Sequence, residues 1–249
     1  MTKAITMMQP GLFPWWGTFE KIALCDVVVH LDHLSWQKGG FLNRFVLRNN
    51  QRMLWCTLPK DRISAGMPIS EVTVSPPSGH LLSHRTKLNQ MCPRAPFIHE
   101  AEALMEKIYR VDTRDAADVA IRSIQEVCAR LQLSAEHVRS SGLDVKYAKT
   151  KMILGIAHDL GCDTYVFGPG RCGLSAHYLD VPMLITAGMN VEVAEYRPAP
   201  RVSILQDVAA AGLVASKLLA PKVAAVNIHG RRHQPIDHLA RVRRVHGNV

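Results

Sequence analysis

The sequence lacks the long apolar segments that anchor or export a protein. All of its apolar runs fall short of the roughly 20 residues that are needed to cross a bilayer. The start of the chain carries one lysine but neither a long apolar stretch nor a small-residue cleavage site, so a signal peptide is not expected. We therefore predict a cytoplasmic protein without a membrane span.

Paired cysteines are also missing. The six cysteines are scattered, and no CxxC pair occurs among them. Zinc sites need ligand spacing of that kind, so we expect no metal centre. In a cytoplasmic chain such cysteines are typically reduced and behave as small buried hydrophobes. Cys172 raises a separate hypothesis of a thiol nucleophile partnered by His177, although no spacing rule supports that pair.

Two common catalytic motifs are absent. The GxxxxGK[ST] of P-loop NTPases and the GxSxG of α/β-hydrolases do not occur. Residues 168–173, Gly-Pro-Gly-Arg-Cys-Gly, do satisfy GxGxxG, and Glu192 follows at the distance expected of a ribose contact. Because the second position is proline and the motif comes late in the chain, we favour a tight loop beside a cleft, with Arg171 as an anion ligand, over a dinucleotide site.

Acidic residues are scarce at the C-terminal end. The chain has a formal net charge of +9, and residues 221–249 contain six basic residues against the single acid Asp237. One interpretation is a solvated basic tail. The other is an electrostatic footprint for RNA or another polyanion. No aromatic residue lies in this tail, which weakens any proposal of base stacking there.

What the chain does contain is an alternation of strand and helix patterns. Residues 4–8 form a short apolar run, residues 15–25 have helical spacing, and residues 27–31 form a near-continuous apolar strand. This order predicts a right-handed βαβ unit. The loop after its first strand would lie at the carboxyl edge of the sheet, where open α/β folds bind ligands.

The rest of the chain also alternates between strand and helix patterns. We expect a mostly parallel, Rossmann-like sheet with a nucleotidyltransferase-like βαβ start, and an additional helical segment over about 81–135. Residues 1–220 would form this domain and residues 221–249 the basic tail. The expected hairpin spans 41–47 and 53–59, and the other expected strands are 69–74, 138–140, 162–167 and 191–196. The expected helices are 100–110, 112–133 with a cap at Asp112-Thr113, 146–160, 175–187 and 203–219.

Several blocks of the chain resemble the WbqC-like protein family. That family opens with QPxxFPWxGxFxKIxxAD, and this sequence has Gln9-Pro10, Phe13-Pro14-Trp15, Gly17, Phe19, Lys21-Ile22 and Asp26. Its DxVQFxK segment and following NR pair are similar to residues 32–38 and 43–44. Its aDtYlsGPGG segment is similar to residues 162–170, and a block like SIIDLLFNxG to residues 203–209. Ser35 and Arg171-Cys172 depart from the pattern.

The resemblance implies transfer chemistry. Members of the family resemble products of O-antigen and other biosynthetic gene clusters, and some have been proposed to transfer glycine or another acyl group to an amine. The first block has the position of the HxGH loop of nucleotidyltransferases, but residues 15–18 read Trp-Trp-Gly-Thr and lack both histidines. An ordinary adenylyl-transfer mechanism is therefore weakened.

The candidate site follows from these blocks. Asp32 lies just past the second strand, where a cleft-facing carboxylate would orient an amine or act as a base, and Lys38 joins it as a catalytic candidate. The candidate substrate-binding residues are Gln9, Phe13, Trp15, Lys21, Asn43, Arg44, Gly168, Gly170 and Arg171. The structural alternative makes Phe13, Trp15 and Trp16 core residues and makes residues 32–44 a surface ion-pair network.

Three functions remain open at this point. The first is a biosynthetic acyl- or aminoacyl-transferase that joins an activated donor to an amine acceptor, with a charged tRNA as a possible donor held by the basic tail. The second is an ATP-dependent amide ligase or another nucleotide-binding enzyme of the same cleft. The third is a non-enzymatic nucleic-acid-binding protein. No cofactor is identified, and a homo-oligomer is compatible with the sequence.

Overall fold

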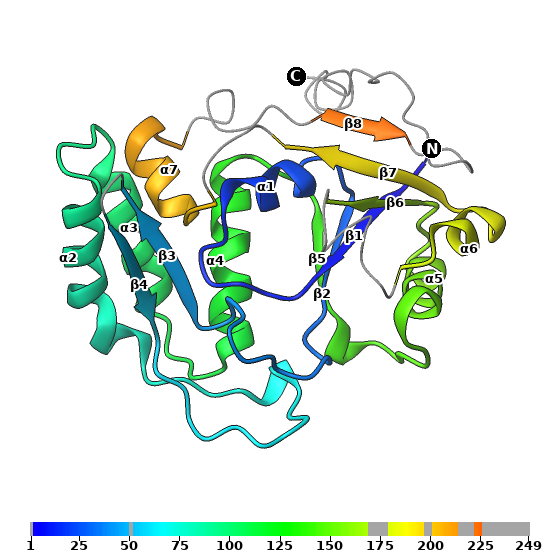
Figure 1. The fold of residues 1–249 in the computed structure, drawn as a ribbon, viewed down its shortest axis with the longest axis horizontal. Helices are drawn as coiled ribbons and strands as arrows, with labels where there is room; N and C mark the ends of the chain where they lie inside the picture. The colour runs from blue at the N-terminus through cyan, green and yellow to red at the C-terminus, as the bar shows by residue number, and fades with distance from the viewer. Residues whose placement is uncertain (1, 50–51, 169–178, 197–200, 214–221, 226–249) are drawn as a thin grey trace.

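The computed structural model describes residues 2–49, 52–168, 179–196, 201–213 and the backbone of 222–225. Its centre is a six-stranded sheet in the order β5-β2-β1-β6-β7-β8, in which the first five strands are parallel and β8 pairs antiparallel with β7 (Figure 1). The strands are β1 (Ala4–Met8), β2 (Val27–His30), β5 (Glu136–Arg139), β6 (Thr164–Phe167), β7 (Asn190–Glu195) and β8 (Lys222–Ala225). The predicted mixed α/β, mostly parallel sheet is confirmed.

The predicted βαβ unit is present at the start of the chain. Helix α1 (Trp16–Ile22) joins β1 to β2, and these strands pair in parallel with Ile5 opposite Val27. Every residue of β2 is buried, as its continuous apolar run indicates. On its other side β1 pairs with β6. The chain order therefore reverses between β1 and β6, which is the kind of switch point where open α/β sheets hold ligands.

Helices cover the two faces of the sheet unequally (Figure 1). One face packs against α5 (Lys149–Asp159) and α6 (Val181–Thr186) in a core that includes Ile5, Val29 and Ile156. The other face meets α1 and α4 (Ala116–Arg130) in a larger core. Beyond α4 lie the antiparallel hairpin of β3 (Arg44–Arg48) and β4 (Met53–Thr57) and the helices α2 (Leu81–Met91), α3 (Ile98–Tyr109) and α7 (Ile204–Ala211). The expected hairpin and the helical segment after residue 81 are thus observed.

The predicted strand over residues 69–74 is wrong. This segment begins with a 3-10 turn, η1 (Ile69–Glu71), and continues with isolated bridges at Thr73 and Val74. Its backbone groups bond to other loops, since Ile69 N donates to Leu34 O and Val74 N donates to Arg114 O. The apolar residues that suggested a strand instead point into the core from an irregular segment, where Ile69, Val72 and Val74 are buried.

Two predicted helix boundaries also need correction. The N-cap of α4 is Asp115, whose carboxylate accepts a hydrogen bond from Asp118 N at 3.0 Å, and not Asp112-Thr113. The last predicted helix, over 203–219, ends at Ala211 because Gly212 adopts φ 73° and turns the chain away. Residues 214–219 lie outside the described part, as do the first residues of the helix predicted over 175–187. None of the described helices is long and apolar enough to span a membrane.

Candidate functional site

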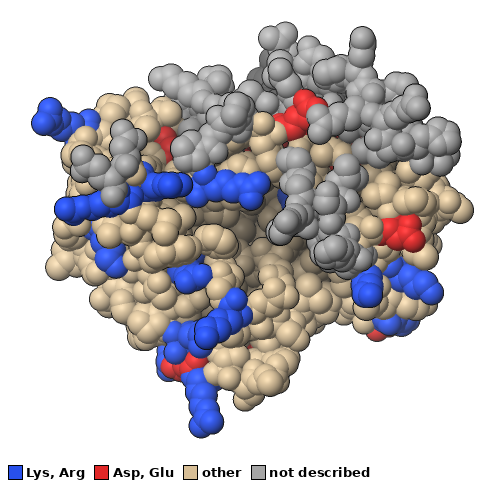
Figure 2. Space-filling model, viewed as in Figure 1, with Lys and Arg blue, Asp and Glu red and all other residues tan. Residues whose placement is uncertain are grey.

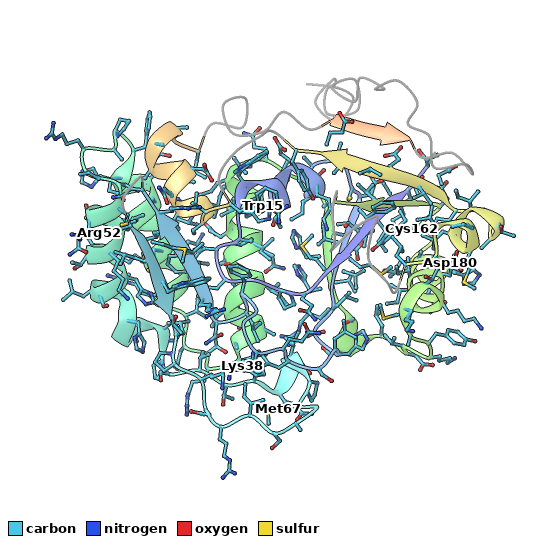
Figure 3. All side chains as sticks on the ribbon, viewed as in Figure 1. Trp15, Lys38, Arg52, Met67, Cys162 and Asp180 are labelled. Atoms are coloured by element: carbon cyan, nitrogen blue, oxygen red, sulfur yellow. The ribbon has the colours of Figure 1, made fainter. Side chains whose placement is uncertain are left out.

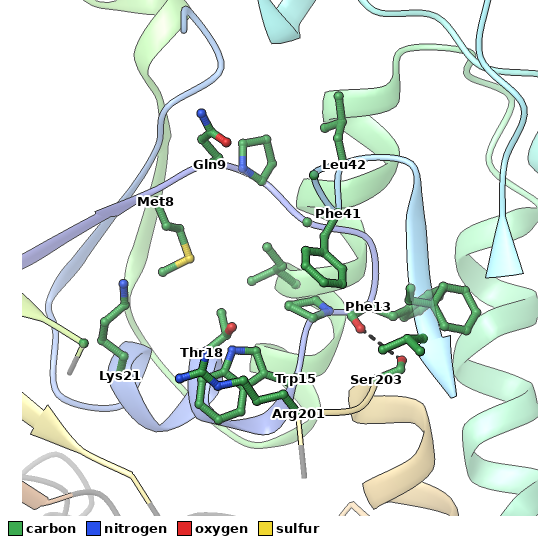
Figure 4. Close-up of a pocket in the computed structure, with 18 of the residues that line it drawn as sticks. Met8, Gln9, Phe13, Trp15, Thr18, Lys21, Phe41, Leu42, Arg201 and Ser203 are labelled. Atoms are coloured by element: carbon green, nitrogen blue, oxygen red, sulfur yellow. Dashed lines mark hydrogen bonds between the residues drawn. The ribbon is translucent and has the colours of Figure 1, made fainter. Parts of the chain in front are cut away.

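The loop after β1 forms one side of a cavity of about 400 Å³. Figure 2 shows a hollow near the centre of the face on which this loop lies, and Figure 4 shows the side chains around it. Of the predicted residues, the cavity is lined by Gln9, Phe13, Trp15, Lys21 and Gly168. They come from the loops after β1 and β6 and from α1. The sheet therefore brings together, at its switch point, residues that lie about 150 positions apart in the sequence.

Phe13 fixes the path of this loop and belongs mainly to the core. Its ring is fully buried, 5.4 Å from the ring of Phe45 and 6.1 Å from that of Tyr109. Its backbone has φ 42°, and its N–H donates to Ser123 Oγ while its carbonyl accepts from Ser203 Oγ, each at 3.0 Å (Figure 4). Two serines from distant helices thus hold a left-handed residue in place, and Phe13 shapes the cavity wall through its backbone.

The rings of Trp15 and Tyr196 form the floor of the cavity beside α1, and the buried ring of Trp16 packs against both. The centroid of Trp15 lies 5.6 Å from that of Trp16 and 5.0 Å from that of Tyr196, in edge-to-face contacts. Two glycines make room for them. A Cβ on Gly17 would lie 2.6 Å from Trp15 Cζ3, and a Cβ on Gly168 would crowd the hydroxyl of Tyr196. Gly17 and Gly168 are therefore packing positions for the aromatic floor.

Lys21 extends from α1 into the cavity, where Figure 4 shows it around the same open space as Gln9, Met8 and Thr18. Its side chain is mostly buried, and within the described residues it forms no ion pair with a carboxylate. Burial lowers the pKa of Lys21 to about 8, opposed only by the Coulombic effect of Cys25. A lysine with this pKa is mostly protonated at neutral pH and has a minor neutral population.

The cavity is electropositive. Lys21 and Arg201 are the charged side chains that line it, and no Asp or Glu does so in the described part of the chain. The guanidinium carbon of Arg201 lies 5.0 Å from the centre of the Trp15 ring, over the aromatic floor. These two cations favour a ligand that carries negative charge.

Asp32 does not lie where the sequence placed it. Its side chain is fully buried, and it is not among the residues that line the cavity. Its two carboxylate oxygens accept hydrogen bonds from Arg139 Nε at 2.6 Å, Ser140 Oγ at 3.1 Å, and both the backbone N–H and the hydroxyl of Ser141 at 2.8 Å. Burial alone would raise the pKa of Asp32, but the donors of Ser141 and Arg139 outweigh it and lower that pKa. Four donors therefore occupy the acceptor positions of the Asp32 carboxylate.

The other residues predicted between 38 and 44 support the mouth of the cavity without lining it. Asn43 is buried and donates to Leu58 O at 2.7 Å. Arg44 donates to Gly39 O and Gly40 O at 2.6 and 3.0 Å and lies 4.2 Å from the Trp55 ring centre. Lys38 is exposed on the loop between β2 and β3, well apart from Trp15 (Figure 3). Gly170, Arg171 and Cys172 lie outside the described residues.

A cluster of polar residues behind the cavity wall was not predicted. It consists of His30, Asp32, His137 and Arg139. Met8, which lines the cavity, pairs in register with His30, and His30 pairs with Arg139. His30 is fully buried, and its Nε2 lies 2.9 Å from Nδ1 of His137. Burial lowers the pKa of His30 to about 3, with the nearby His137 lowering it further. The polar cluster is therefore uncharged at neutral pH apart from its Asp32–Arg139 ion pair.

Sequence reasoning also missed several residues of the cavity itself, namely Thr18, Trp36, Phe41, Tyr196, Arg201 and Ser203. One signal for part of this set was available. Tyr196 directly follows β7, so the rule that ligands bind at the carboxyl ends of parallel strands would have selected it and the segment that contains Arg201. Trp36 and Phe41 carry no such signal, because they reach the cavity from the long loop between β2 and β3.

Comparisons with known proteins cover most of this chain. The WbqC-like protein family matches residues 9–206, which include most of the residues that line the cavity. An uncharacterized protein of Mycobacterium tuberculosis, Rv1507c, is 21% identical over 168 residues, which cover 67% of this chain and 73% of that protein. No solved structure matches the chain.

Proposed function

The chain belongs to the WbqC-like protein family, and we propose that it is a biosynthetic acyl- or aminoacyl-transferase that forms an amide inside the cavity beside Lys21. The observation that carries this proposal is a mostly buried lysine with a pKa of about 8 that faces an open, aromatic-lined space. A base must be unprotonated to accept a proton, and a base whose pKa is close to the working pH is the most effective.

In this reaction the amine of the acceptor attacks the carbonyl carbon of an activated acyl or aminoacyl ester. A C–N bond forms, the C–O bond to the donor breaks, and the donor leaves as an alcohol after it takes up a proton. Neutral Lys21 accepts the proton that the attacking amine loses, and its ammonium form returns a proton to the leaving oxygen. Gln9 and Thr18, which line the same cavity, supply polar groups that orient the two reactants.

Lys21 replaces Asp32 as the proposed base. Asp32 is surrounded by donors and its pKa is lowered, so it has neither a free lone pair directed at the cavity nor the proton affinity of a base near neutral pH. Lys38 is exposed outside the cavity. A cytoplasmic setting, with activated donors at hand, suits this chemistry.

The test compares variants at Lys21 in an amide-forming assay. The protein is incubated with labelled glycine, a tRNA pool with its synthetase, and a panel of amines, and amide products are measured by mass spectrometry. Lys21→Met should lower the rate by about 10²- to 10⁴-fold, the usual contribution of a general base. Lys21→Arg should be equally slow because a guanidinium stays protonated at every working pH.

The matched control is Lys151→Met, on the exposed surface of α5 at the opposite face of the sheet. It should leave the rate unchanged. An active Lys21→Arg variant would contradict the proposed base and make Lys21 an anion ligand instead. Absence of any amide product across the panel would contradict transfer altogether.

An ATP-dependent amide ligase is the second candidate, and the location of the cavity favours it. The cavity lies at the switch point between β1 and β6, where α/β folds commonly bind nucleotides. A ligase would activate a free carboxylate and exchange labelled pyrophosphate into ATP. Exchange that depends on an added acid would select this candidate, and its absence over a panel of acids would exclude it.

A further inference from the structure

Three aromatic side chains around the cavity each lie beside a cation. Arg201 lies 5.0 Å from the ring centre of Trp15, Lys60 lies 4.7 Å from that of Trp36, and Arg44 lies 4.2 Å from that of Trp55. We call these six residues, with Phe41, the cationic rim. In each pair the cation lies over one face of the ring, so a stacking partner can use only the other face or the exposed ring of Phe41.

The cationic rim is continuous with the cavity. Trp15, Arg201, Trp36 and Phe41 all line it. The ring of Phe41 is 52% exposed and lies 5.7 Å from that of Trp55, so it connects the third pair to the mouth. Figure 2 shows Lys and Arg side chains gathered in a band on this face that reaches the central hollow. A ligand in the cavity therefore lies next to Trp15, Arg201, Trp36 and Phe41.

The charges of the cationic rim are not neutralised by carboxylates of the described part of the chain. Within the described residues, none of Arg44, Lys60 and Arg201 forms an ion pair with a carboxylate, whereas neighbouring Asp61 pairs with Arg114 at 2.8 Å. The Arg44 guanidinium donates to two backbone carbonyls and lies over the Trp55 ring, and neither of these neighbours carries a charge. Together with a net charge of +9, this leaves a local positive field at the mouth of the cavity.

Single-stranded nucleic acid matches this arrangement. Its unpaired bases stack on exposed aromatic rings, and its phosphates follow basic side chains along a groove. A duplex cannot use the rings because its bases are already stacked. Trp15 and Tyr196 line the cavity and could receive a base at the inner end of such a strand.

We propose that the cationic rim binds the 3′ end of a single-stranded RNA and directs it toward Lys21. The choice of RNA rests on the proposed function, because a ribose 2′- or 3′-hydroxyl at that end can carry an aminoacyl ester. In this proposal the cationic rim binds the RNA, a function that the sequence suggested for the basic tail. The residues of that tail beyond 225 lie outside the described part of the chain.

The test measures binding of a fluorescent RNA oligonucleotide with a free 3′ end to the full chain, over a range of salt concentrations. Lys60→Gln together with Arg201→Gln should weaken binding at least tenfold and reduce the slope of log affinity against log salt by about 1.4, the value for two phosphate contacts of a single strand. Phe41→Ala should weaken binding several-fold without changing that slope, since it removes stacking and no charge. The same RNA closed into a circle should bind more weakly than the linear form.

The matched control is Lys149→Gln together with Lys151→Gln, which removes the same charge from α5 on the opposite face and should leave binding nearly unchanged. Deletion of residues 226–249 separates the rim from the tail. The proposal is overturned if only this deletion abolishes binding, or if linear RNA, circular RNA and inorganic polyphosphate bind alike and Phe41→Ala has no effect.

These outcomes are separate from those of the transfer assay. Rim-dependent RNA binding without amide formation would support the RNA site and count against the transferase. Amide formation from a small ester donor, in a protein that binds no RNA, would support the transferase and overturn the RNA site.

Discussion

The indole of Trp15 occupies the space in which any side chain at position 17 would begin. A Cβ on Gly17 would lie 2.6 Å from Cζ3 and 2.7 Å from Cζ2 of Trp15, distances that real Cβ atoms do not adopt. Glycine in a helix is ordinarily a weakness, because alanine there is more stable by about 0.5–1 kcal/mol. At position 17 the packing of Trp15 reverses that preference.

Gly17→Ala should therefore lower the free energy of unfolding by about 1–3 kcal/mol, the usual cost of overpacking a filled core. The displaced Trp15 should also disturb Tyr196, whose ring lies 5.0 Å from it, and change the tryptophan fluorescence. Urea unfolding and fluorescence check both effects. Gly79→Ala is the control, since a Cβ there meets nothing within 4 Å. Equal stability of the two variants would contradict the packing role.

Lys21→Met should make the protein more stable and less active at the same time. The unfolded chain keeps the lysine proton up to a pKa near 10.5, whereas the folded chain releases it at about 8. The folded state therefore binds fewer protons between those values, and wild-type stability rises with pH across this window. Below pH 8 the buried charge costs its full amount, so removing it should add roughly 1–3 kcal/mol there.

The stability gain of Lys21→Met should shrink as the pH is raised from 8 toward 10.5, which urea unfolding at several pH values measures. In the wild type, the rate of amide formation should rise through pH 8 as Lys21 loses its proton. A gain that is constant with pH would mean that the methionine stabilises by apolar packing alone.

Asp32→Ala should destabilise the fold by about 1–3 kcal/mol, because it leaves the buried donors of Ser140 and Ser141 without their acceptor, while Arg139 keeps its contact with Asp115. Asp144→Ala is the matched control. The ion pair of Asp144 with Lys146 is 3.0 Å long but has side chains that are 78% and 67% exposed, so its loss should leave the stability nearly unchanged. A stably folded but inactive Asp32→Ala variant would return Asp32 to the chemistry.

Mild acid should destabilise the protein through its buried histidines. Burial lowers the pKa of His30 to about 3 and that of His84 to about 4, and both histidines titrate near 6.5 when the chain unfolds. Between those values the unfolded state binds protons that the folded state refuses, so stability is complete above pH 6.5 and falls as the pH drops. Each histidine should contribute a slope of up to about 1.4 kcal/mol per pH unit.

Urea unfolding between pH 7 and pH 4.5 tests this dependence. His30→Leu and His84→Leu should each flatten the curve of stability against pH. In the wild type, His84 Nδ1 lies 2.6 Å from the Tyr109 hydroxyl. His99→Leu should not, because that side chain is 92% exposed. An unchanged curve in both buried variants would assign the acid sensitivity to carboxylates such as Asp32.

The elements that could be predicted from the sequence are those with a local signal. The runs in β1 and β2 are mostly apolar, and β3 and β4 flank a polar turn, so each was recognisable from a few consecutive residues. Residues 69–74 have a similar apolar content but bond to the loops near Leu34 and Arg114, far away in the chain. No local pattern distinguishes such a segment from a strand.

The residues of the site also fall into those with a local sequence signal and those without one. Gln9, Trp15, Lys21 and Gly168 were found because they follow the first and sixth strands, and parallel strands end at a common edge. Asp32 also follows a strand, but its carboxylate is captured by Arg139 and its neighbours, about 107 residues later. Arg201 and Trp36 were missed because the loops that carry them reach the cavity only after the chain has folded.

The sequence by itself determined the order of the elements, the family, and the place of the segment 9–17 at the carboxyl edge of the sheet, because all three depend on short-range patterns and a few chiral rules. The tertiary structure alone decided which charges have partners. Asp32 and Lys21 are both polar residues beside the same strands, yet one is neutralised by four donors and the other faces an open cavity without a carboxylate. That difference depends on contacts between distant residues, and so does the burial that lowers the pKa of Lys21.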